Sequence, residues 1–129
     1  MAMMTVEQRS ELVEKIVPEM ILVEAKKSEY FNKDYTQEEI ECFNGDTFQE
    51  YADGKVENED FILELQESHG GYEGAGEEMW LVYSLEMKSD NSVIHFRING
   101  WYNSWDCSEW EGIDIVDPKE VQKIEWVKA

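Results

Sequence analysis

The residues best suited to chemistry lie close together between positions 101 and 111. This stretch, WYNSWDCSEWE, contains three tryptophans, one tyrosine and three carboxylates, and it has no basic residue. Carboxylates attract lysine and arginine, and aromatic faces bind the same cations through cation–π contacts. Tryptophan and tyrosine are also enriched among the residues that dominate binding at protein interfaces. The stretch therefore predicts a binding site for a basic partner. The candidate contact residues are Trp105, Asp106, Glu109 and Trp110.

The same residue types permit two other interpretations of this stretch. Aromatic walls with paired carboxylates are also typical of carbohydrate-binding and glycoside-hydrolysing sites. Alternatively, one or two of the tryptophans belong to the core at the end of a strand. We expect Trp101 to be buried, and at least one of Trp105 and Trp110 to be accessible.

Other constellations that could support catalysis or hold a cofactor are weak. His69 and His95 lie on different predicted elements, and Cys42 and Cys107 are far apart, so neither a zinc site nor a nucleophilic pair follows from the spacing. The glycine-rich stretch 69–78 matches neither phosphate-binding fingerprint, contains no lysine and has three glutamates. We therefore predict no catalytic residue, no cofactor, no metal site and no enzymatic activity.

Acidic charge is the most unusual property of the chain. Thirty acidic residues stand against eleven lysines and arginines in 129 residues, a net charge of −19. Such a charge repels phosphate backbones and anionic lipid surfaces, which disfavours direct binding to nucleic acids and membranes. A basic protein remains a suitable partner, and a homodimer is compatible with the sequence.

The acidic residues are concentrated in one segment. Residues 34–78 contain fifteen of them and a single lysine, a net charge of −14, whereas the other 84 residues carry −5. Acidity that served solubility alone could be interspersed with lysine, as on ordinary surfaces. The clustering of acidic residues in one segment therefore favours a partner-binding surface. Acidity that serves only solubility remains an alternative. The candidate contacts in this segment are Glu38, Glu41, Asp53 and Glu57.

Helical patterns come first along the chain. Thr5 and Gln8 have the spacing of a capping box, and an apolar stripe follows at helical spacing, so a helix is expected from residue 6. Pro18 either kinks this helix or begins a second one. A second capping box, Thr36 to Glu39, predicts a short helix that Asn44-Gly45 ends, and residues 47–51 fit one more turn. The stripe consists of Val13, Ile16, Val17, Met20, Ile21 and Ala25.

Alternating patterns follow after residue 54 and predict strands at 61–67, 79–87, 92–101 and 121–128, with a further short strand at 113–116. Residues 103–112 are expected to form a polar loop. Helices followed by strands with short connections predict an α+β domain. We expect N-terminal helices packed on one face of an antiparallel meander sheet of four or five strands, in a single domain spanning residues 1–129.

The N-terminal fourteen residues contain no apolar stretch of signal-peptide length, and no segment is long and apolar enough for a membrane helix. We therefore expect a cytoplasmic protein. Both cysteines are expected to be reduced thiols in that compartment.

Three short stretches in the second half resemble small uncharacterised proteins of tailed bacteriophages. They are GGYEGAGE at 70–77, GWYNSWD at 100–106, and VDPKEV at 116–121 with Glu125-Trp126 behind it. The resemblance covers residues 70–129 and offers no catalytic residues to carry over. It implies a phage origin and action in the cytoplasm of an infected bacterium.

Charge and resemblance together favour a small acidic inhibitor that resembles DNA mimics. Its target would be a basic, nucleic-acid-handling protein of the host or its defences, such as a CRISPR effector, a restriction nuclease or a polymerase subunit. An antitoxin-like or immunity-like neutraliser of a basic toxin uses the same physics and is the first alternative. A carbohydrate site in the aromatic stretch is the second.

The charge gives a direct prediction about nucleic acids. Because the chain repels phosphates, the isolated protein should show no binding to labelled duplex DNA in fluorescence polarisation at low salt, where electrostatic attraction is least screened. A basic DNA-binding domain serves as the positive control. Tight binding by this chain would contradict the charge-based interpretation.

Overall fold

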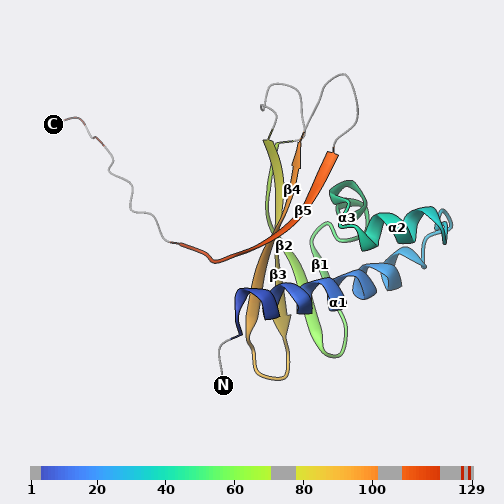
Figure 1. Ribbon diagram of the computed structural model, residues 1–129, viewed down its shortest axis with the longest axis horizontal. Coiled ribbons are helices and arrows are strands. Elements are labelled where there is room, and N and C mark those ends of the chain that lie inside the picture. The colour runs from blue at the N-terminus through green and yellow to red at the C-terminus, as the bar shows by residue number, and fades with distance from the viewer. Residues whose placement is uncertain (1–3, 71–77, 102–108, 120–125, 127, 129) are drawn as a thin grey trace.

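The computed structural model describes residues 4–70, 78–101, 109–119, 126 and 128. Three helices precede five strands, and the sheet is an antiparallel meander in the order β1-β2-β3-β4-β5, with the helices packed on it (Figure 1). The expected α+β architecture is confirmed. The elements are α1 Val6–Ala25, α2 Tyr35–Glu41, α3 Gly45–Tyr51, β1 Lys55–Glu57, β2 Phe61–His69, β3 Glu78–Met87, β4 Val93–Trp101 and β5 Glu109–Val116.

Helix α1 begins at the predicted capping box. The Thr5 hydroxyl accepts a hydrogen bond from the Gln8 backbone N–H, and the Gln8 side chain accepts one from the Thr5 N–H. Pro18 lies inside one continuous helix, so it does not begin a second helix. The buried stripe continues on both sides of the proline, and its packing against the sheet outweighs the loss of one backbone donor. The buried residues of α1 are Val13, Val17, Met20, Ile21 and Ala25.

The predicted capping box at Thr36 is wrong, because both of its side chains have other partners. Thr36 is buried inside α2, and its hydroxyl accepts a hydrogen bond from the Asn32 backbone N–H. The Asn32 side chain in turn accepts from the N–H groups of residues 34 and 35, where α2 begins. The carboxylate of Glu39 accepts from the Thr47 hydroxyl at 2.7 Å and so joins α2 to α3.

Asn44 caps the start of α3 and does not simply end α2. Its side chain accepts hydrogen bonds from the backbone N–H groups of Asp46 and Thr47. The chain turns between the two helices at Phe43, which has a φ of 58°. The expected single turn at residues 47–51 therefore forms the last five residues of a seven-residue helix.

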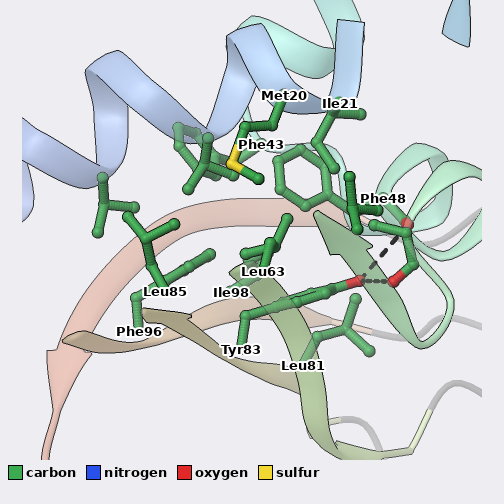
Figure 2. Close-up of a cluster of buried hydrophobic side chains, with 14 of the residues drawn as sticks. Met20, Ile21, Phe43, Phe48, Leu63, Leu81, Tyr83, Leu85, Phe96 and Ile98 are labelled. Atoms are coloured by element: carbon green, nitrogen blue, oxygen red, sulfur yellow. Dashed lines mark hydrogen bonds between the residues drawn. The ribbon is translucent and has the colours of Figure 1, made fainter. Parts of the chain in front are cut away.

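The inner face of the sheet and the helices enclose an aromatic core (Figure 2). The Tyr83 ring stacks on Phe96 at 5.6 Å between centroids and meets Phe48 edge-on at 6.0 Å. The Tyr83 hydroxyl donates to the backbone carbonyl of Ala52 at 2.9 Å, just beyond the end of α3. Burial raises the pKa of Tyr83 far above its usual value, and the charge of Asp53 adds to this rise, so the phenol remains a donor.

The C-terminal part of the sheet differs from the sequence-based expectation. Strands β2, β3 and β4 match the predicted strands, but β5 begins at Glu109, so residues 109–112 form strand and not loop. The predicted strand at 121–128 falls mostly outside the described residues. Of its two described members, Trp126 and Lys128, neither lies in a strand. None of the helices described is long and apolar enough to cross a membrane.

The Tyr83 hydrogen bond can be tested by removing one oxygen atom. Tyr83→Phe leaves a buried carbonyl without its donor, and should lower the free energy of unfolding by about 1–2 kcal/mol. Denaturant unfolding followed by circular dichroism measures this change. Tyr30→Phe is the matched control, because Tyr30 is 80% exposed, and it should leave the stability unchanged. Equal stability of both variants would contradict the assigned role of the hydroxyl.

Candidate functional site

The six candidate contact residues that the structure describes come from separate elements. Glu38 and Glu41 lie exposed on α2, Asp53 follows α3, and Glu57 ends β1. Glu109 and Trp110 lie at the start of β5. Trp105 and Asp106 lie outside the described residues. The structure therefore separates an acidic surface of the helical layer from an aromatic one at the β4–β5 end of the sheet.

Glu57 of β1 differs from Glu38, Glu41 and Asp53 because it already has cationic partners. Its carboxylate forms ion pairs with Lys88 and, at 3.7 Å, with Lys55. The hydrogen bond and charge of Lys88 lower the pKa of Glu57 below its usual range, with a smaller contribution from Lys55. Its negative charge is thus largely compensated within the protein.

Glu38, Glu41 and Asp53 present uncompensated charge, and we call them the α2–β1 acids. The ion pairs among the described residues are Arg9–Asp117, Lys27–Glu24, Lys55–Glu57 and Lys88–Glu57, and these three acids take part in none of them. The neutral side-chain amide of Gln37 donates a hydrogen bond to the Glu41 carboxylate at 3.0 Å. All three acids are exposed and remain available to a cation from outside.

Trp110 points toward the helices. It lies beside Gly100 in the β4–β5 register and packs against the core. A Cβ atom added to Gly45, the first residue of α3, would lie only 2.4 Å from its indole ring, and one added to Gly100 would lie 2.6 Å away. Two glycines thus provide the space for this ring. The half-buried Trp110 therefore packs between α3 and β5.

Trp101 is exposed, which contradicts the expectation that it is buried. Its exposed fraction is 40%, because it follows the alternation of β4. Ile94, Phe96 and Ile98 point to the core, so the odd-numbered residues of β4 point away from the helices. We call this side the outer face of the sheet, and of its two described tryptophans, Trp80 and Trp101, Trp101 is the more exposed.

A second tryptophan on the outer face, Trp80 of β3, is enclosed by its neighbours. His69 of β2 stacks on it with ring centroids 4.0 Å apart, and the guanidinium of Arg97 on β4 lies 5.5 Å from its centroid. The Arg97 Nε donates to Asn99 at 2.7 Å, and Asn99 donates to Asp114 of β5 at 2.9 Å. These contacts form a continuous row across four strands.

A shallow hollow of about 440 Å³ lies beside this row on the outer face. Sequence reasoning missed Glu78, Trp80, Arg97 and Trp101 as members of a site. The strict alternation of residues 93–101 was the available signal, because it places Trp101 opposite the apolar Ile94, Phe96 and Ile98. The hollow is lined by Glu78, Met79, Trp80, Arg97, Asn99, Gly100, Trp101, Glu111, Ile113 and Asp114.

Neither a metal-binding group nor a similarity to known proteins assigns a function to the described residues. Within the described residues, no group of three or more histidines, cysteines or carboxylates could hold a metal ion. Cys42 is exposed with a free thiol, and Cys107 lies outside the described residues. Comparisons with protein-family models, with curated proteins and with solved structures give no match.

The inward position of Trp110 predicts that a glycine-to-alanine change at Gly45 lowers stability, whereas such a change usually stabilises a helix. Gly45→Ala should destabilise the protein by about 1–3 kcal/mol, because the added methyl group overlaps the indole ring. In a Trp110→Ala background, the same change should be neutral or stabilise α3 by up to about 1 kcal/mol, as alanine ordinarily does in helices. Chemical unfolding of the four proteins of this double-mutant cycle measures both effects. Additive changes would show that the ring lies elsewhere.

Proposed function

We propose that this chain is a small acidic phage-type inhibitor that binds a basic, nucleic-acid-handling protein through the α2–β1 acids. The observation that carries the proposal is that Glu38, Glu41 and Asp53 are exposed and take part in none of the ion pairs among the described residues. They lie in the segment whose net charge is −14. A surface of this kind repels itself and is relieved when a cationic surface covers it.

Competition is the mechanism that this surface supports. Carboxylates of the α2–β1 acids occupy positions opposite lysine and arginine side chains that otherwise hold phosphates, and the anions bound to the target are released. Charge complementarity accelerates the encounter, so association should be fast and should slow as salt is added. Each exposed pair contributes only about 0–1 kcal/mol, and the affinity is therefore distributed over many contacts.

Contacts within the helical layer support this proposal because they hold the acids in place. The hydrogen bond between Glu39 and Thr47 joins α2 to α3, and Tyr83 holds the carbonyl of Ala52, the residue before Asp53. Fixed charges lose less conformational freedom on binding than charges on a mobile segment. The same surface would suit a neutraliser of a basic toxin, so the identity of the target distinguishes these two roles.

The test begins with capture of partners from a bacterial lysate at low and high salt, followed by mass spectrometry. We expect the captured protein to bind nucleic acid, and to bind either this chain or its nucleic acid but not both in a competition assay. The triple variant Glu38→Lys, Glu41→Lys and Asp53→Lys should then lose binding in calorimetry while its circular dichroism spectrum stays unchanged.

The matched control is the triple variant Glu7→Lys, Glu11→Lys and Glu14→Lys. These three residues are exposed on α1, and the variant changes the net charge by the same amount. It should slow association but retain binding. Equal losses in both variants would show that total charge acts and not a defined surface. Simultaneous binding of this chain and nucleic acid to the captured protein would overturn the competitive mechanism.

A further inference from the structure

We propose that Trp101 on the outer face of the sheet, with Glu78 and Glu109 on either side of it, is a docking site for one lysine or arginine side chain of a protein partner. The inference rests on the proposed function in that the partner is basic. It adds a second contact surface, on the opposite face of the sheet from the helices, with a defined recognition chemistry.

Strand register brings the three residues together. Glu78 of β3 pairs directly with Trp101 of β4, and Trp101 pairs directly with Glu109 of β5. Directly opposite residues in antiparallel strands have Cβ atoms about 4.5–5.5 Å apart and point to the same face. An exposed indole ring therefore lies between two exposed carboxylates, one on each neighbouring strand.

Trp101 differs from Trp80 in the residues that stack on its ring. Trp80 already has His69 and Arg97 against it, from the strands on either side. Among the described residues no ring and no cation stacks on Trp101. The protein thus uses an indole to hold a guanidinium at one point of the outer face. At the other point no described ring or cation stacks on the indole, which can accept a cation from outside.

The charge around the hollow selects for a cation. Glu111 and Asp114 line it together with Glu78, and Arg97 is the only base among the described residues of its lining. The guanidinium of Arg97 is engaged by Asn99 and Trp80. A phosphate or carboxylate ligand would meet net repulsion, because three carboxylates stand against one guanidinium. A cationic side chain gains from the indole face and from the carboxylates at the same time.

Nuclear magnetic resonance of the indole N–H groups tests the site directly. The probes are N-acetyl-arginine N-methylamide and its lysine counterpart, and the control is N-acetyl-citrulline N-methylamide, which has nearly the shape of arginine without its charge. We expect both cationic probes to shift the Trp101 indole signal in a saturable manner, and citrulline to leave it in place. Citrulline shifting this signal as strongly as arginine would overturn the proposal.

A matched pair of variants separates a defined site from diffuse charge. Glu78→Gln with Glu109→Gln should weaken arginine binding about fivefold, as expected for the loss of two exposed charge contacts. Glu64→Gln with Glu67→Gln removes the same charge from exposed residues of β2, and should change binding less than twofold if such contacts are local. Trp101→Leu should abolish the shifts of the Glu78 and Glu109 backbone amides. Equal weakening by the two double variants would overturn the site.

Two further outcomes separate this inference from its alternatives. A Trp101 shift with cellotriose or maltotriose, and none with the arginine probe, would assign the hollow to carbohydrate and overturn the proposal. The arginine probe should still shift Trp101 in the triple variant of the α2–β1 acids. If it does, and no basic partner is captured, the cation site stands and the proposed inhibitor function fails. If the partner is captured and the arginine probe has no effect, the proposed function stands and the cation site at Trp101 fails.

Discussion

The packing of the sheet's aromatic inner face against the helices is the contact on which the rest of the structure depends. Phe48, Tyr83 and Phe96 form its centre, with the Tyr83 hydroxyl bound to the end of α3. Once Tyr83 and Phe96 face inward, the two-residue period of the strands fixes the direction of every other side chain in β3 and β4. The side chains on the outer face therefore point away from the helices, among them Trp80, Arg97 and Trp101. The core thus determines both the position of Asp53 and the composition of the outer face.

Electrostatic repulsion is the main force that opposes this packing. With a net charge of −19, the folded chain brings acidic residues closer together than they are in the unfolded chain. The described ion pairs are exposed or half-exposed contacts, and such pairs contribute little to stability. Burial of apolar surface must therefore supply nearly all of the stability. A cationic partner would relieve the repulsion without any rearrangement of the core.

Local patterns predicted the elements that need only local information. The capping box at Thr5 and the stripe from Val13 to Ile21 define α1, and alternation defines β2, β3 and β4. Local patterns do not place residues whose positions depend on distant contacts. Trp110 points inward because Gly45 and Gly100 leave room for its ring, and neither glycine is near it in sequence. Thr36 and Glu39 have the spacing of a capping box, but burial and the contact with Thr47 decide their partners. The exposure of Trp101 followed from the alternation of β4, so that part of the candidate site was within reach of the sequence.

The order of elements along the chain has a consequence for synthesis on the ribosome. Helix α1, with the apolar stripe of Val13, Val17 and Ile21, emerges before the strands, yet the strands that contact it, β1, β4 and β5, are made about 40 to 95 residues later. At translation rates of about 5–20 residues per second, the nascent helix waits several seconds for its partner. The sheet itself then forms quickly, because each strand of the meander pairs with the one just before it. During that interval the acidic residues beside the stripe, among them Glu11, Glu14 and Glu19, carry like charge, which opposes association between nascent chains.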